Sequence, residues 1–283
     1  MKKSRLIVKS TGESVPFAPE KLRKSLTHSG APSGVVDRIV QKVTDEIYEG
    51  MSTREIYNRA FALLREHRNS CASRYKLKKA IYELGPTGFP FEKFVSAVLK
   101  HSGHHTRTNQ IHQGRCVSHE IDVVITDSEG ITLIECKFHS DESKKCDVKV
   151  PLYIHSRFQD IAHWNQHKRK EPLHLKPGWV VTNTRFTSDA LAFGKCVGLY
   201  LLSWNYPSKN SLKRRIDKSG LYPITVSTLL SGREKQFLLE RGVVLCKQLL
   251  KAPYYLDHLG VADPRKTRVL EEFSQLSDVT SPS

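Results

Sequence analysis

A pair of apolar runs joined by a four-residue turn constrains the fold of this chain more than any other sequence feature. The runs span residues 120–126 and 131–138 and contain many isoleucine, valine and threonine residues, and the turn at 127–130 has the sequence Asp-Ser-Glu-Gly. β-Branched runs on both sides of a turn that ends in glycine are typical of a β-hairpin. The middle of the chain is therefore predicted to contain a sheet.

The order of segments around this hairpin predicts how the sheet is covered. An apolar stripe at helical spacing runs through residues 91–100, and one further strand is expected between that helix and the hairpin. Downstream, helices that begin at Pro151 and Ser188 alternate with short strands at 179–183 and 199–204. This order predicts an α/β fold, a mixed sheet with helices on its faces, over residues 87–205.

The segments on either side are expected to be smaller. Residues 1–86 begin with a hairpin around Gly12 and continue with helices, one of which opens at Pro19 and another behind a capping box at 52–55. Residues 206–283 show short helical runs separated by glycine and proline. The chain is thus predicted to consist of an N-terminal α+β domain, an α/β core and a C-terminal helical segment.

The balance of charge points to a polyanionic partner. The chain has 45 lysine and arginine residues against 29 acidic residues, a formal net charge of +16. Such an excess favours DNA as partner, since each neutralised phosphate releases condensed counterions; a generally basic soluble surface is the alternative.

The amino-acid composition also indicates in which compartment of the cell the protein is expected. No apolar run approaches the roughly 20 residues of a membrane helix, and the basic N-terminus lacks the apolar stretch of a secretory signal. The six scattered cysteines form no C-x-x-C pair, which fits reduced thiols. We therefore expect a cytoplasmic protein without membrane contact.

Charged residues within the hairpin indicate a catalytic site. Glu135 and Lys137 share one face of a strand whose other residues are apolar, and Asp122 lies on the partner strand. Charges in a buried strand are unfavourable unless they are paired or bind a metal. Two carboxylates form an oxygen site suited to Mg²⁺ or Mn²⁺, and a neighbouring lysine can stabilise charge that develops on a phosphate. Glu92, on the preceding helix, is a further carboxylate for the metal or its waters. A surface ion pair on an edge strand is the alternative.

These residues resemble a known motif. Asp122, then Glu135-x-Lys137, with Glu92 on the helix before them, resemble the PD-(D/E)xK nuclease superfamily, and most closely its restriction-endonuclease-like, Mrr-type domains. The expected order of elements is similar to the α-β-β-β-α-β core of that superfamily. The resemblance implies that Asp122, Glu135 and Lys137 bind Mg²⁺ and carry out hydrolysis, and that Glu92 corresponds to the helix acid of many members. The proline of the superfamily name is absent, because Ile121 precedes Asp122.

A second resemblance covers about residues 4–84. The stretches at 8–26 and 72–81 resemble an ATP-cone, a small regulatory nucleotide-binding domain in which basic groups surround a triphosphate. The arginine that usually follows the strand-end lysine is replaced by Ser10. The alternative is a basic helical module that docks DNA or protein without a nucleotide. The residues that the resemblance implies around ATP or dATP are Val8, Lys9, Gly12, Lys21 and Tyr75, with Arg74 and Lys78 as further candidates.

Together these patterns predict an enzyme, a Mg²⁺-dependent endodeoxyribonuclease regulated by ATP or dATP. An alternative of a different class is a nucleotide-responsive DNA-binding regulator with an inactive nuclease fold, and an RNA-cleaving or processing enzyme is a third. Residues 226–250 faintly resemble a helix-hairpin-helix, which contacts DNA backbone, and a helical cap on the core is an equal alternative. Cleavage of a duplex by a nuclease with one site favours a homo-oligomer.

Overall fold

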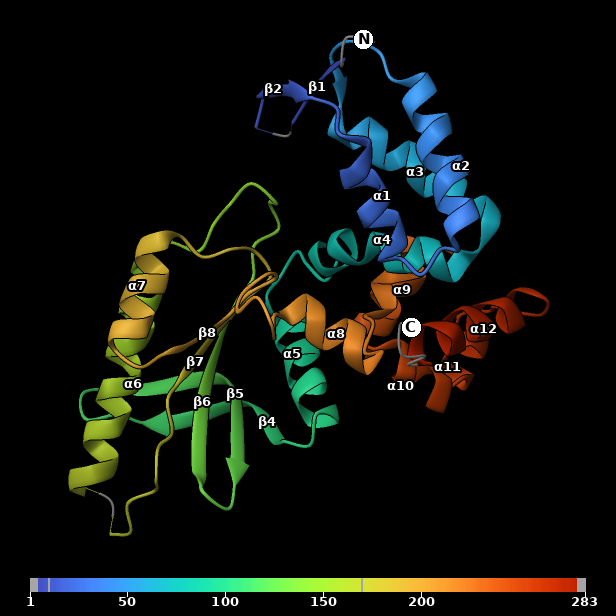
Figure 1. The fold of residues 1–283 in the computed structure, drawn as a ribbon. Coiled ribbons are helices and arrows are strands. Elements are labelled where there is room, and N and C mark those ends of the chain that lie inside the picture. Colours follow the sequence, from blue (N-terminus) through green and yellow to red (C-terminus); the bar gives the residue numbers. More distant parts are fainter. Residues whose placement is uncertain (1–4, 10, 169, 279–283) are drawn as a thin grey trace.

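The computed structural model describes residues 5–9, 11–168 and 170–278. Figure 1 shows an N-terminal part in blue, a sheet with its helices in green to yellow, and a C-terminal group of short helices in orange to red. Ser10, one of the predicted turn residues, lies outside the described residues.

The N-terminal part combines a small mixed sheet with four helices of the described chain. The hairpin, the helix that opens at Pro19 and the capping box of Ser52 and Glu55 are confirmed. The third strand of this sheet was not predicted, because a strand of two residues is too short to show the alternation of apolar and polar residues. The order is β2-β1-β3, with β1 antiparallel to β2 and parallel to β3. The elements are β1 (Leu6–Val8), β2 (Ser14–Pro16), α1 (Pro19–Thr27), α2 (Ser33–Glu46), β3 (Met51–Ser52), α3 (Thr53–His67) and α4 (Asn69–Tyr82).

The central part is a five-stranded mixed sheet whose order of elements agrees with the sequence prediction. The strands lie in the order β4-β5-β6-β7-β8, antiparallel from β4 to β6 and parallel from β6 to β8. One helix begins two residues before Pro151 rather than at it. The elements are α5 (Phe89–His101), β4 (His105–Gln113), β5 (Ser118–Asp127), β6 (Gly130–Lys137), α6 (Lys149–Lys168), β7 (Trp179–Thr182), α7 (Ser188–Cys196) and β8 (Tyr200–Leu202).

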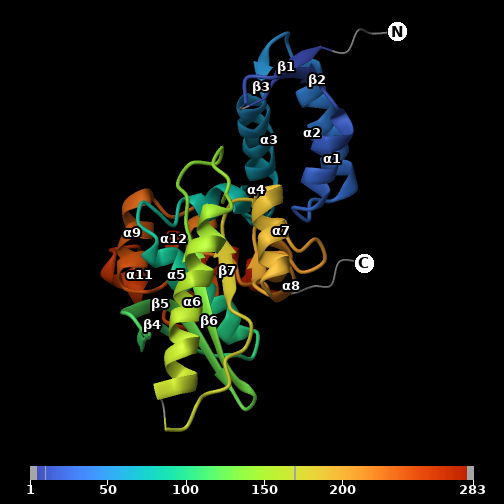
Figure 2. The ribbon, with the colours of Figure 1, turned by 90° about the vertical axis from the view of Figure 1, so that its left-hand side faces the viewer.

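The two faces of this sheet are buried against different helices. One apolar core joins Val124 and Leu133 of the strands to Ile154 and Phe158 of α6. Figure 2 shows α6 and α7 in front of the strands on this side. The other face packs on α5 and on the C-terminal helices, so the C-terminal segment shares a core with the sheet.

The C-terminal segment is helical, as predicted, but more broken than the sequence pattern indicated. The run at 246–260 divides at Pro253 into two short helices, because proline lacks the amide that would continue the first. No helix of the described residues is long and apolar enough to cross a membrane. The elements are α8 (Leu212–Ser219), a 3₁₀ helix η1 (Ile224–Val226), α9 (Gly232–Glu240), α10 (Cys246–Lys251), α11 (Tyr254–His258) and α12 (Arg265–Ser277).

A buried carboxylate ties α4 to the C-terminal segment. Glu272 of α12 is 3% exposed, and its Oε1 accepts hydrogen bonds from Ser73 Oγ of α4 at 2.6 Å and from the amide and hydroxyl of Thr228 at 2.9 Å. Its Oε2 accepts a bond from Ser227 Oγ at 2.6 Å. Hydrogen bonds to a charged group are stronger than neutral ones, and each buried donor here depends on one side chain.

Replacing Glu272 by alanine is expected to destabilise the protein by about 3 kcal/mol, because several buried donors lose their acceptor at once. The measurement is the free energy of unfolding in urea. Glu271→Ala is the matched control, since Glu271 is the exposed neighbour on the same helix and should change stability by less than about 0.5 kcal/mol. Equal stabilities of the two variants would contradict the expectation.

Candidate active site

The predicted carboxylates Asp122 and Glu135 lie where β5 and β6 diverge. The ladder between these strands runs from the turn to the pair Val123–Ile134 and ends there, so Asp122 and Glu135 each lie one position past its last pair. Beyond that pair, Asp122 Oδ2 accepts the amide hydrogen of Cys136 at 2.7 Å. A side-chain oxygen thus satisfies a backbone donor of β6, and the Asp122 carboxylate is held at the end of the hairpin ladder.

Glu135 is paired with a residue that the sequence analysis did not single out. Arg157 of α6 donates to Glu135 Oε1 at 2.5 Å, and its other terminal nitrogen donates to the backbone oxygen of Glu120. The second carboxylate oxygen of Glu135 is buried and has no hydrogen-bond partner in the part of the chain that the structure describes. Such an oxygen is costly to bury and leaves one coordination position open.

Glu92 completes a group of three carboxylates. It lies in the first turn of α5, on the side of the sheet opposite α6. Burial, and after it the charge of Asp122, raise the pKa values of Glu92 and Glu135 to about 7. Burial also raises the pKa of Asp122, against the opposing effects of the Cys136 amide and the positive charges of Arg157 and Lys137. The three groups are therefore close enough to repel one another when ionised.

Lys137 ends β6, where its side chain is exposed. The chain after it is fixed by Asn183, a fully buried residue that follows β7. Asn183 Oδ1 accepts from the amide of His139 at 2.9 Å, and its Nδ2 donates to the oxygen of His139 at 2.7 Å. This clamp holds the segment directly after Lys137 and was not predicted.

Asn109 of β4 is a further residue that the sequence reasoning missed. It has a φ of 52°, the one non-glycine residue with positive φ among those described, and the register of β4 and β5 places it opposite Asp122. Its amide donates to Glu120 Oε1 at 3.1 Å, and a hydrogen bond from it lowers the pKa of Glu92. Left-handed backbone within a strand is strained and is often found at functional sites. An asparagine inside a strand, where it is disfavoured, was the available signal.

The titration of Glu135 predicts a measurable effect on stability. A carboxyl whose pKa is raised in the folded state stays protonated there while the unfolded chain ionises, so stability falls as pH rises from about 4.5 to about 7. Glutamine cannot ionise. In chelator, Glu135→Gln is expected to exceed the parent protein in unfolding free energy by about 1 to 2 kcal/mol at pH 8, with no such difference at pH 4.5. Urea unfolding at both pH values checks this; a pH-independent difference would contradict it.

The N-terminal part contains a cavity that receives several of the predicted nucleotide-binding residues. It has a volume of about 230 Å³, and Lys9, Lys21 and Tyr75 line it. Tyr75 stacks on Tyr57 of α3 with ring centroids 5.0 Å apart and planes 11° apart. The hydroxyl of Tyr57 is buried without a partner in the described chain. Two cations beside a stacked aromatic pair suit a nucleotide. The sequence analysis did not predict Tyr57 for this site, because its position in an amphipathic helix is typical of a core residue.

The other predicted residues of this site lie elsewhere. Val8 and Gly12 belong to the adjoining hairpin without lining the cavity, and Gly12 turns the chain with a φ of 82°. Arg74 points away, because it donates to the backbone oxygen of Gln275 in α12 at 2.5 Å. Lys78 instead forms an ion pair with Glu142 at 3.3 Å.

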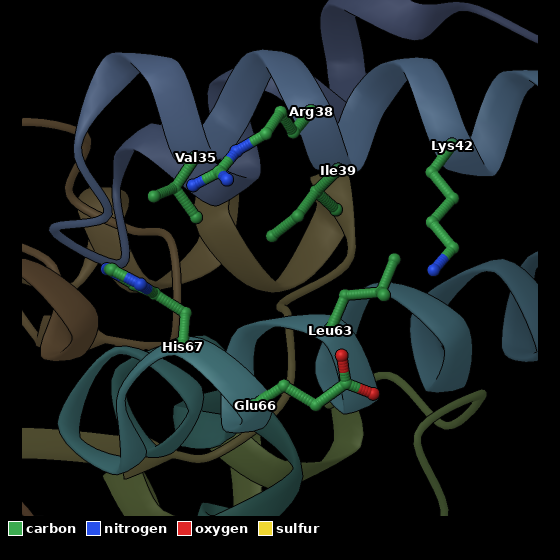
Figure 3. Close-up of a pocket in the computed structure, with 7 residues that line it drawn as sticks. All are labelled: Val35, Arg38, Ile39, Lys42, Leu63, Glu66 and His67. Atoms are coloured by element: carbon green, nitrogen blue, oxygen red, sulfur yellow. The ribbon is translucent and has the colours of Figure 1, made fainter.

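A larger cavity of about 350 Å³ lies between α2 and α3. Figure 3 shows Arg38 and Lys42 projecting into it from one helix and Glu66 and His67 from the other. No aromatic ring of a tyrosine, phenylalanine or tryptophan is among its described lining residues. The smaller cavity, where Tyr57 and Tyr75 offer a stacking surface, therefore suits a nucleotide better.

Comparisons with known proteins find family models that match an N-terminal and a C-terminal stretch of the chain. The family model of the ATP cone domain matches residues 5–83, and that of the "AF1548-like, C-terminal" domain matches residues 222–277. An uncharacterised protein of Archaeoglobus fulgidus is 32% identical over 179 residues, which are 63% of this chain and 97% of that protein. This chain belongs to the AF1548-like family. It is also similar to the crystal structure of AF1548, a protein of unknown function, with 30% identity and a TM-score of 0.55 over 67% of this chain and 98% of the other.

The comparisons confirm one sequence-based prediction for this AF1548-like protein, the N-terminal ATP-cone, and with it support binding of a regulatory nucleotide. They name no catalytic activity for the family. The chemistry of its central sheet therefore has to be argued from the side chains themselves.

The carboxylates of this AF1548-like protein fit a divalent cation in type. As the side chains stand, no three histidine, cysteine, aspartate or glutamate residues of the described chain are arranged to hold an ion. Mg²⁺, however, is usually bound through one or two carboxylates, with water and substrate phosphate completing its shell. Asp122 and Glu135 supply two such groups, and the unpartnered oxygen of Glu135 is the observation that favours the fit. Arg157 supplies the positive charge at Glu135 in this structure.

Proposed function

We propose that this protein is a divalent-metal-dependent endonuclease that hydrolyses DNA phosphodiester bonds under the control of ATP or dATP. The observation that carries the proposal is the meeting of Asp122 and Glu135 at the diverging end of one hairpin, with a buried Glu135 oxygen that lacks a partner. The order helix, three strands, helix, strand resembles the PD-(D/E)xK core, and the residue types match its motif.

Each residue of the candidate site has its own role in the proposed reaction. Asp122 and Glu135 would hold Mg²⁺ or Mn²⁺, with Glu92 binding the ion or its waters. A bound ion of this kind acts as a Lewis acid and lowers the pKa of a water molecule. Lys137, exposed at the end of β6, would stabilise negative charge on the phosphate or orient the attacking water.

The net charge supports DNA as the partner in this proposal, and the free cysteines support a location inside the cell. The net charge of +16 favours binding to a polyanion such as DNA. All six cysteines are free thiols, which agrees with the reducing interior of a cell, where we place the protein.

One observation favours a second candidate function, a nucleotide-responsive DNA-binding regulator without catalysis. Arg157 already neutralises Glu135, so the carboxylates have a partner in the absence of a metal. A former active site that has lost its catalytic activity and is stabilised by an arginine would have the same arrangement of side chains.

Nicking of supercoiled plasmid by the full-length protein separates the two candidates. The nuclease is expected to convert plasmid to open circles with Mg²⁺ or Mn²⁺ and to stop when chelator is added, with a rate that changes on addition of ATP or dATP. DNA binding without cleavage on plasmid, branched and single-stranded DNA under all these conditions would support the regulator. Cleavage of RNA but not of DNA would reassign the substrate.

A further inference from the structure

A cavity of about 230 Å³ lies where the ATP-cone meets the central sheet. Strands β6, β7 and β8 are parallel neighbours, so their carboxyl ends share one edge of the sheet. Glu135 and Lys137 end β6, Arg185 follows β7 and Trp204 follows β8. The cavity therefore opens on the same edge as the candidate active site, where ligands of parallel sheets commonly bind.

The walls of this cavity are held in place by the protein itself. Asn183 is fully buried and binds the backbone of His139, as described above. The amide of Trp204 donates to the oxygen of Thr184 at 3.2 Å, and the amide of Cys146 donates to the oxygen of Arg185 at 2.8 Å. The loops after β6, β7 and β8 are thus fastened to one another, and the cavity does not depend on a ligand to form.

The lining has the chemistry of a site for one nucleotide of a strand. Arg185 and Lys78 supply two exposed cations, and Tyr82 and Trp204 supply half-buried aromatic rings. The acid in the lining, Glu142, is paired with Lys78 at 3.3 Å, and both side chains are about half exposed. A surface ion pair of this kind contributes little, so a phosphate can compete for Lys78. Cations bind the phosphate and aromatic rings stack with a base of any identity.

One wall of the cavity belongs to the helix that also lines the nucleotide cavity of the ATP-cone. Tyr75, Lys78 and Tyr82 follow one another at spacings of three and four residues, so they lie on one face of α4. Tyr75 lines the nucleotide cavity, whereas Lys78 and Tyr82 line the cavity at the junction. Movement of this helix face on nucleotide binding would change both cavities together.

We propose that this junction cavity binds a nucleotide unit of the DNA strand next to the bond that is cut, with the phosphate between Lys78 and Arg185 and the base against Trp204. The inference rests on the proposed function for its choice of ligand, and adds a subsite built jointly by the ATP-cone and the sheet.

Fluorescence anisotropy with a labelled single-stranded oligonucleotide tests the subsite in chelator, where no cleavage occurs. Arg185→Ala and Lys78→Ala are each expected to weaken binding about five- to tenfold. Each should also reduce the slope of log affinity against log salt by about 0.7, the loss of one phosphate contact. Arg185→Lys should retain part of the affinity. Unlabelled deoxynucleoside monophosphate should compete only weakly, whereas unlabelled oligonucleotide should compete fully.

Lys79→Ala is the matched control, because Lys79 is an exposed neighbour of Lys78 on α4 and is not part of the lining. If Arg185→Ala and Lys78→Ala bind DNA like this control, or if the parent protein binds no DNA, the subsite is disproved. Strong competition by the monophosphate would assign the cavity to a free nucleotide and overturn the proposal. If Arg185→Ala and Lys78→Ala weaken DNA binding but the parent protein never nicks plasmid, the subsite stands and the nuclease activity is disproved. If the parent protein nicks plasmid but Arg185→Ala binds DNA normally, the nuclease activity stands and the subsite is disproved.

Discussion

Glu135→Gln is expected to reduce metal-dependent nicking of plasmid by at least about 1000-fold. The substitution keeps the size of the side chain and removes the negative charge that would hold the cation. DNA binding measured in chelator should stay within about twofold of the parent value, because Glu135 does not contact phosphate without a metal. Lys137→Met is expected to cause a loss of about 100-fold or more, since a methionine stabilises no charge on phosphorus.

Glu129→Gln is the matched control for this experiment. Glu129 is on the same hairpin, but it lies at the opposite end, in an exposed turn where it pairs with Lys176 at 2.8 Å. Its substitution should leave the nicking rate within about twofold. Equal activity of Glu135→Gln and Glu129→Gln would falsify the assignment of the active site, even if nicking itself is observed.

Joint replacement of Lys9 and Lys21 by alanine is expected to weaken binding of ATP or dATP by about 100-fold, each lysine contributing about tenfold. Both line the cavity beside the stacked rings of Tyr57 and Tyr75, and charge-assisted contacts to phosphate are the strong interactions of such a site. Isothermal titration calorimetry on the full-length protein gives the affinities.

Lys24→Ala provides the control for the nucleotide site, because Lys24 is exposed on the same helix as Lys21 and is absent from the described lining of the cavity. It should bind nucleotide like the parent protein. If the double variant retains full affinity, the nucleotide binds elsewhere, and the cavity between α2 and α3 becomes the next site to test.

The sequence predicted those features that repeat locally or depend on a turn. The hairpin at β5 and β6 follows from two apolar runs around 127–130, and the capping box from Ser52 and Glu55 at fixed spacing. The position of Asp122 and Glu135 directly past the last ladder pair follows in turn from the hairpin register. Each of these features is set by residues that are near one another in the chain.

The features that escaped prediction depend on residues distant in the chain. Arg157 reaches Glu135 from α6, and Asn183 clamps the segment after Lys137 from beyond β7. Asn109 has its positive φ at the position opposite Asp122, where the sheet is distorted. The distortion shows in the burial of β5, where Ile121 and Val123 enter different cores although strict alternation would place them on one face.

The position of α4 has a consequence for how the chain can be divided. Its first half, with Cys71 and Ala72, is buried in the core of the ATP-cone, and its second half, with Leu77, Ala80 and Ile81, is buried with α5 and the C-terminal helices. The boundary of the ATP-cone family, at residue 83, therefore falls at the end of a helix that both cores require. Deleting the ATP-cone at that boundary together with α4 would strip the remaining protein of part of its interior, so a truncated protein that is meant to fold has to keep this helix.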